Sequence, residues 1–219
     1  MSTQGLERLL YTAGDLPKPE TNKNHLRLYG HTLCPFVGIA RYSLALKKVE
    51  FQDVQTDLNK KAAWHLELNG GMVPVLETPA GDLIRESGVI SQLAVELGQD
   101  QGVELVPKDP IAAAKMRLEI EAFRNKTSIF WPVIYPAVGT DLAAIDKFGA
   151  ELLPMWESIC AKHSDDKWLF GTNEPTLLDV YTAPFFEILY LWNTPDSVMS
   201  NVTDRLELSK NAPHLIKYV

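Results

Sequence analysis

One cysteine, Cys34, combines a nucleophilic side chain with a position that suits chemistry. Residues 25–29 alternate polar and apolar side chains, as a short half-buried strand does. From Pro35 onward apolar residues recur at helical spacing, and proline suits the first helical position because its missing N–H would have no intrahelical partner there. The sequence therefore predicts a thiol at the point where a strand ends and a helix begins.

That position predicts an acidic thiol. Unpaired N–H groups and the helix dipole at a helix N-terminus stabilise negative charge. A cysteine there can have a pKa of about 3.5–7.5 instead of its usual value of about 8.5, and the thiolate is the form that attacks. We therefore expect Cys34 to be reactive. The alternative is that it is a small buried apolar side chain, as many free cysteines are.

The remaining cysteine and the histidines predict no second reactive centre. The chain has two cysteines, too few for a disulfide framework in a protein of this length. Val37 occupies the position that a C-x-x-C pair beginning at Cys34 would need, so a dithiol pair is not expected. We expect Cys160 to be buried and structural. The five histidines lack the spacing of metal ligands, so no metal site is predicted.

Composition bounds the class of protein. The chain has 219 residues, 46% of them hydrophobic, and a formal net charge of −7. This charge argues against nucleic acid or an anionic membrane surface as the main partner. No apolar run approaches the roughly 20 residues that a membrane span needs. The N-terminus lacks the basic and apolar regions of a signal peptide, so we expect a cytoplasmic protein.

Residues 25–98 predict one compact α/β unit around Cys34. After the helix that follows Cys34, the patterns predict a strand at 49–55, a helix at 59–68, strands at 73–77 and 83–85, and a helix to residue 97. The Val73–Pro74 bond opens a strand and is a candidate for the cis form. Ser87 is expected to cap the last helix. This β-α-β-α-β-β-α order predicts a thioredoxin-like domain with a mixed four-stranded sheet.

The rest of the chain predicts an arm, a linker and a helical domain. Residues 1–24 are expected to form a loosely held N-terminal arm that can pack on the surface, and the polar, proline-containing segment 99–110 a linker. Residues 111–219 show only helical spacing, with Pro154 expected to kink or divide a helix over 142–163. Thr176 and Asp179 predict a capping box before a helix that is apolar nearly all round and therefore buried.

These features together resemble a known family. A thioredoxin-like half followed by an all-helical half is similar to the cytosolic glutathione transferases, and Cys34-Pro35-Phe36 resembles the active-site motif of their Omega class. Val73-Pro74, Glu86-Ser87 and the Thr176-to-Asp179 capping box also match motifs of the family, in the same order. The resemblance covers residues 25 to about 217.

The resemblance implies a glutathione site. Glu86 and Ser87 match the γ-glutamyl site, where a carboxylate pairs with the ammonium group and a helix start binds a carboxylate. Val73 would present its backbone to the cysteinyl part as an added strand. Lys61 aligns with a lysine at the glycyl end. The implied glutathione-binding residues are Phe36, Lys61, Val73, Pro74, Glu86 and Ser87, with Cys34 as the catalytic residue.

The implied activity is that of a glutathione-dependent thiol transferase. Cys34 would form a mixed disulfide with glutathione, resolved by a second glutathione, in deglutathionylation or dehydroascorbate reduction. The implied partners are glutathione, a small electrophile or disulfide acceptor, and a second copy in a homodimer. Two alternatives stay open. One is a glutathionyl-quinone reductase or another glutathione-dependent enzyme that uses the same thiol. The other is a non-catalytic glutathione-binding or chloride-channel-like protein.

Overall fold

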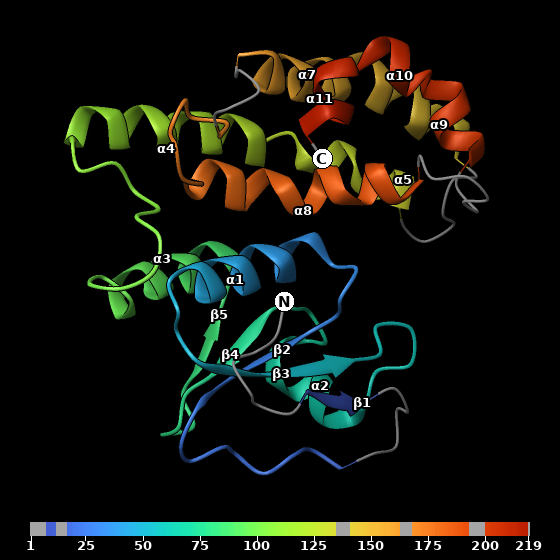
Figure 1. Cartoon of the computed structure of the whole chain (residues 1–219). Helices are drawn as coiled ribbons and strands as arrows, with labels where there is room; N and C mark the ends of the chain where they lie inside the picture. Colours follow the sequence, from blue (N-terminus) through green and yellow to red (C-terminus); the bar gives the residue numbers. More distant parts are fainter. Residues whose placement is uncertain (1–7, 12–16, 135–140, 163–167, 193–199, 219) are drawn as a thin grey trace. The chain divides into compact units, whose positions relative to one another are not determined.

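The chain forms two compact units in a computed structural model, residues Met1–Glu104 and Leu105–Val219. The structure describes residues 8–11, 17–134, 141–162, 168–192 and 200–218. The first unit is α/β and the second contains only helices among its described residues (Figure 1). This confirms the predicted fold class.

The first unit is built on a five-stranded mixed sheet. Its strands are β1 (Leu9–Tyr11), β2 (Leu26–Gly30), β3 (Phe51–Thr56), β4 (Val75–Glu77) and β5 (Leu83–Arg85). Their order is β1-β3-β2-β4-β5, with β3 parallel to both β1 and β2, and β4 antiparallel to β2 and β5. The predicted four strands are all present. The sequence does not predict the fifth strand, β1, because three residues are too short to show a period.

Helices cover both faces of this sheet. Helices α1 (Pro35–Leu46) and α3 (Ser87–Leu97) lie side by side on one face, and α2 (Ala63–Asn69) lies on the other (Figure 1). Leu28, Phe51 and Leu76 of the sheet pack under α1 and α3. Alternate residues such as Tyr29, Val54 and Val75 pack against α2. This division follows from the two-residue period of strand side chains. The same face that carries α1 therefore carries Cys34.

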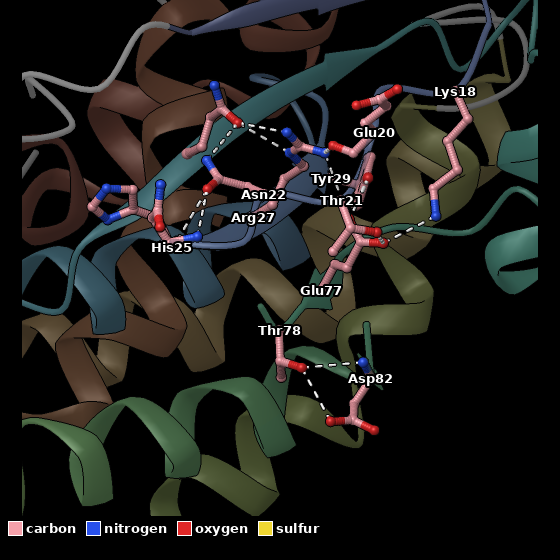
Figure 2. Close-up of polar contacts among 12 residues, drawn as sticks. Lys18, Glu20, Thr21, Asn22, His25, Arg27, Tyr29, Glu77, Thr78 and Asp82 are labelled. Atoms are coloured by element: carbon pink, nitrogen blue, oxygen red, sulfur yellow. Dashed lines mark hydrogen bonds and ion pairs between the residues drawn. The ribbon is translucent and has the colours of Figure 1, made fainter. Parts of the chain in front are cut away.

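The N-terminal segment is held by buried polar contacts. Glu77 is 2% exposed and accepts hydrogen bonds from Lys18 Nζ and Thr21 Oγ1, each at 3.0 Å, and from Tyr29 Oη at 2.8 Å (Figure 2). Arg27 donates to the carbonyl of Glu20. The described residues 17–24 of the predicted N-terminal arm are therefore held against the sheet rather than loosely attached. The reason is that a buried carboxylate needs donors, and this segment supplies two of them.

The second unit consists of helices of very different length. They are α4 (Pro110–Arg124), α5 (Trp131–Ile134), α6 (Leu142–Lys147), α7 (Leu153–Ala161), α8 (Leu177–Trp192), α9 (Ser200–Leu206), α10 (Leu208–Asn211) and α11 (Pro213–Tyr218), with a 3₁₀ turn at Thr127–Ile129. The helix expected over 142–163 is divided by a π-helical segment, Phe148–Leu152, whose last residue lies two positions before Pro154. Proline has no N–H to bond the carbonyl four residues earlier, so the register changes there.

Helix α8 is the buried centre of this unit, as predicted. Phe185 and Phe186 are at most 2% exposed and contact the rings of Phe123 and Trp156. Only the C-terminal end of α8 emerges, where Tyr190 and Leu191 are about half exposed, at 46% and 51%. The helical core therefore depends on one element, whose position is fixed at its N-terminus by Asp179.

Asp179 does more than the predicted capping box requires. Its carboxylate accepts hydrogen bonds from Thr176 N–H at 2.7 Å, Thr176 Oγ1 at 2.9 Å and Leu169 N–H at 2.8 Å. Tyr218 of α11 donates to the same carboxylate at 3.0 Å. The Thr176 hydroxyl donates to Asp179 rather than accepting from a backbone N–H. Only the half of the capping box in which Asp179 accepts from Thr176 N–H is therefore formed. Asp179 instead joins three segments of the unit.

Candidate active site

Cys34 lies where the sequence predicts it, between β2 and α1. It is the N-cap of α1, with φ −86° and ψ 116°, and Pro35 is the first helical residue. Helix α1 approaches the end of β2 very closely. A Cβ on Gly30 would lie 2.3 Å from Cγ1 of Val37, so only glycine fits at this strand end. The first turn of the helix, and with it Cys34, is therefore set directly against the sheet.

The Cys34 side chain is almost entirely buried. It is 7% exposed and belongs to the apolar cluster under α1 and α3, with Val37, Ala40 and Ile90. Val73 and Phe36 are partly buried and pack against the same cluster. Three of the predicted site residues are thus brought together by hydrophobic packing.

Burial raises the pKa of the Cys34 thiol above its usual value. The backbone N–H groups of Val37 and Phe36, together with the Arg41 guanidinium, act in the opposite direction. The helix start therefore favours the thiolate as predicted, but the loss of hydration outweighs it. The expectation of a lowered pKa is wrong in sign, because a sequence pattern shows the helix terminus and does not show the apolar packing around it.

The bond between Val73 and Pro74 is cis. This confirms the candidate cis proline. Pro74 directly precedes β4, which begins at Val75 rather than at residue 73. The backbone of Val73 therefore precedes the antiparallel pairing of β4 with β2.

Glu86 and Ser87 lie at the start of α3. Glu86 is the N-cap, with φ 68° and ψ 119°, and Ser87 is the first helical residue and 9% exposed. Ser87 is therefore not the cap that was predicted. A positive φ in a residue other than glycine is costly and is typical of functional sites. Since Ile90 of α3 packs in the Cys34 cluster, the first turn of α3 belongs to the same face of the sheet.

Lys61 lies outside this cluster. Its exposed side chain runs over Gly71, where a Cβ would lie 2.6 Å from Lys61 Cδ. The Lys61 charge and, more strongly, burial lower the pKa of His65. Lys61 is therefore close to the turn that precedes Val73, on the side of α2.

The second cysteine, Cys160, is also buried, but its charged neighbours disfavour the thiolate instead of favouring it. Cys160 is 4% exposed, and burial, with Glu157 and Asp179, raises its pKa to about 12. Among the described residues no group of three or more His, Cys, Asp or Glu side chains could hold a metal ion. No described helix combines the length and apolar character needed to cross a membrane.

Two features of the site could not be expected from the motifs. One is the positive φ of Glu86, which has no signal in the sequence because glutamate normally avoids this region. The other is Arg41, whose charge acts on Cys34 from seven residues away. The spacing of Cys34 and Arg41 is a usable signal, since residues seven apart share one face of a helix.

Comparisons with known proteins agree on the family of this architecture. A model of the glutathione S-transferase N-terminal domain matches residues 33–96. Over 178 residues the chain is 26% identical to glutathione S-transferase omega-1 of Rattus norvegicus, covering 80% of this chain and 72% of the relative. It is 30% identical over 179 residues to probable glutathione S-transferase BZ2 of Zea mays, covering 75% and 74%. A Tau class glutathione S-transferase from mango, Mangifera indica, superposes with a TM-score of 0.66 at 25% identity, covering 90% and 87%.

Proposed function

Because the chain belongs to the glutathione transferase family, we propose that it is an Omega-like, glutathione-dependent thiol transferase. The observation that carries the proposal is a single cysteine at the N-cap of α1, in one cluster with Val73 and Phe36. A serine or tyrosine there would only stabilise the thiolate of glutathione for conjugation. A cysteine can itself become covalently linked to glutathione.

The proposed reaction has two thiol–disulfide exchanges. The Cys34 thiolate attacks the glutathione sulfur of a mixed disulfide, forming a Cys34–glutathione disulfide and releasing the substrate thiolate. The thiolate of a second glutathione then attacks this disulfide, which gives glutathione disulfide and restores the Cys34 thiolate. One protein thiol suffices, consistent with Val37 in place of a second cysteine. This reaction is deglutathionylation. We also propose dehydroascorbate reduction, in which the Cys34 thiolate would first add to a dehydroascorbate carbonyl; glutathione would then attack the Cys34 sulfur, releasing ascorbate and leaving the same Cys34–glutathione disulfide for the second glutathione to resolve.

The other site residues would hold the tripeptide. We propose that the first-turn N–H groups of α3, at Ser87, bind the γ-glutamyl carboxylate and that Glu86 pairs with its ammonium group. The backbone of Val73, oriented by Pro74, would pair with the cysteinyl part. Lys61 would attract the glycyl carboxylate, and Phe36 would contact the ligand beside Cys34. In this assignment residues 25–98 are the glutathione-binding domain and residues 111–219 the helical domain.

Mass spectrometry after incubation with glutathione disulfide tests the proposal. We expect one glutathionyl adduct, mapped to Cys34 and absent in Cys34→Ala. Cys160→Ser is the matched control and should keep the adduct, because Glu157 and Asp179 disfavour the Cys160 thiolate, whereas the helix N–H groups and Arg41 favour that of Cys34. An adduct that persists in Cys34→Ala and maps to Cys160 contradicts the assignment.

A second candidate, glutathione conjugation, is favoured by the raised pKa of Cys34. A protonated thiol can donate a hydrogen bond to the thiolate of bound glutathione, as a hydroxyl group does. Cys34→Ser separates the two activities. Thiol transfer should disappear in this variant, whereas conjugation with 1-chloro-2,4-dinitrobenzene should persist or increase. Glutathionyl-quinones belong in the same substrate panel, and glutathione binding without any turnover would indicate a non-catalytic protein.

We also propose a homodimer in the cytoplasm, without a nucleic-acid or membrane partner. The support is the family resemblance and, against nucleic acid, the net charge of −7. Sedimentation equilibrium measures the mass in solution directly, and a monomer at micromolar concentration would refute the dimer.

A further inference from the structure

A buried polar network on the α1 side of the sheet is not used by the proposed reaction. Phe51, Asp53 and Gln55 alternate along β3 and therefore point to one face. Phe51 packs in the Cys34 cluster, but Asp53 and Gln55 continue the same row with polar side chains that are 0% and 6% exposed. A buried carboxylate is costly unless it is paired, so this row needs partners.

Four contacts supply these partners and define what we call the Arg41 network. Asp53 Oδ1 lies 3.2 Å from Arg41 Nη2 and accepts a hydrogen bond from Gln55 Nε2 at 2.9 Å. Asp53 Oδ2 lies 3.0 Å from Arg8 Nε. Thr32 Oγ1 donates to Gln55 Oε1 at 2.7 Å. The network therefore joins α1, β3, the residue before β1 and the turn after β2.

This network reaches the nucleophile by two routes. Through the backbone, Thr32 lies in the turn that Cys34 N–H closes by donating to the carbonyl of His31 at 3.1 Å. Through the helix, Arg41 follows Cys34 by seven residues, on the same face and about 10 Å along the axis. One hydrogen-bonded path thus fixes the turn, and one charge lies along the helix below the thiol.

The network carries an excess of positive charge. Two guanidinium groups, of Arg8 and Arg41, face the single carboxylate of Asp53. Arg41 Nε is buried and has no hydrogen-bond partner among the described residues. The Arg41 charge lowers the pKa of Cys34 and also that of His31, although in both groups burial is the largest cause of the shift.

We propose that Arg41 is a positioning residue for Cys34: held by Asp53, it places a positive charge below the thiol, while Gln55 and Thr32 fix the turn that precedes it. The inference rests on the proposed function for its purpose, because only the thiolate attacks a disulfide. Asp57, directly after β3, also acts on His31 and opposes the Arg41 charge there. Arg27 bonds Gln52, and Glu77 bonds Tyr29, on the opposite face of the sheet.

The pH dependence of iodoacetamide alkylation tests this role. It is measured in Cys160→Ser protein, so that Cys34 is the remaining thiol. Arg41→Gln should raise the pKa of Cys34 further and slow alkylation about threefold at pH 7, the effect expected when a charge about 10 Å away is removed. Asp53→Asn should change the rate in the opposite direction, because it leaves the Arg41 charge uncompensated. Arg27→Gln removes an arginine charge that is even more buried than that of Arg41 but lies on the other face of the sheet, so it should leave the alkylation profile unchanged.

Opposite signs separate electrostatics from simple loosening of the fold. A structural effect would move Arg41→Gln and Asp53→Asn in the same direction, and that result overturns the proposal. If Asp53→Asn does not fold, Arg41→Lys is the alternative variant, because it keeps the positive charge. Slowing of alkylation in Arg41→Lys as large as in Arg41→Gln would also overturn the proposal. In the NMR titration of His31, Arg41→Gln should raise the imidazole pKa. Alkylation needs no glutathione, so these outcomes are independent of whether the adduct with glutathione disulfide forms.

Discussion

At the scale of single residues, Cys34 is subject to two opposing effects. The N–H groups of Val37 and Phe36 and the Arg41 charge favour the thiolate, and burial among apolar side chains disfavours it. Burial is the larger effect, so the pKa is raised. Within the proposed reaction, the thiolate is then a minor species at neutral pH, and its fraction limits the first exchange step.

In the wild-type protein, alkylation of Cys34 should therefore require a higher pH than alkylation of free cysteine. The rate of Cys34 alkylation should increase steeply as pH rises. It should reach half of its maximum at a pH above about 8.5, which is the usual pKa of a free cysteine. A rate that is already maximal at pH 7 would contradict the raised pKa. Free cysteine, measured under the same conditions, is the control.

Glu86 should show a conflict between stability and binding. Its φ of 68° costs a residue with a Cβ about 1 kcal/mol, which Glu86→Gly should recover as increased thermal stability. The same substitution removes the carboxylate proposed to bind the ammonium group, so the affinity for glutathione should fall in calorimetry. Lys48→Gly is the matched control, because Lys48 has φ 54°, is exposed and lies outside the site. It should gain stability without losing affinity.

At the scale of secondary-structure elements, the N-terminal ends of helices determine where the side chains of the site and of the helical core lie. The first turn of α1 lies against Gly30, and the first turn of α3 follows the strained Glu86. In the helical unit Asp179 fixes the start of α8 and also binds Leu169 and Tyr218. Both units thus use a helix N-terminus to organise other segments.

Asp179→Ala should be far more damaging than the loss of an ordinary cap. It leaves buried N–H and O–H donors of Leu169, Thr176 and Tyr218 without an acceptor, at a cost of about 3 kcal/mol or more. Asp109→Ala is the control, because the exposed Asp109 caps α4 with one bond to Ala112 and should cost about 1 kcal/mol. Urea denaturation measures both, and equal losses would contradict the joining role of Asp179.

At the scale of the whole molecule, acid stability should depend on one buried carboxylate. Burial alone would raise the pKa of Glu77, but hydrogen bonds from Lys18, Tyr29 and Thr21 outweigh it and the pKa is lowered. A carboxylate with a lowered pKa stabilises the folded state above its unfolded pKa of about 4.3, and this stability is lost as pH falls through the folded value.

Glu77→Gln should remove this part of the pH dependence. We expect the variant to unfold in less urea than the wild type at pH 7, and the difference should shrink as pH falls below about 4.3. Asp82→Asn is the control, since this exposed carboxylate binds Thr78 in a turn. A difference between Glu77→Gln and wild type that stays constant from pH 7 to pH 3 would contradict a titrating Glu77.

The sequence alone determined the local features of this protein. The order of elements in residues 25–98, the helix start at Pro35 and the candidate cis bond at Val73–Pro74 all depend on neighbours a few residues apart, and all three are present in the structure. The division of the helix near Pro154 follows from one missing N–H. Such features are readable because their physical cause lies within one helical turn or one strand.

Only the tertiary structure decided the properties that depend on distant residues. The sign of the Cys34 pKa shift comes from apolar packing by β2, β3 and α3. Strand β1 exists because β3, more than 40 residues later, offers it a partner. The partners of Glu77 and Asp53 come from segments far along the chain. Desolvation and charge act through space, so their balance at the thiol is fixed only when the chain has folded.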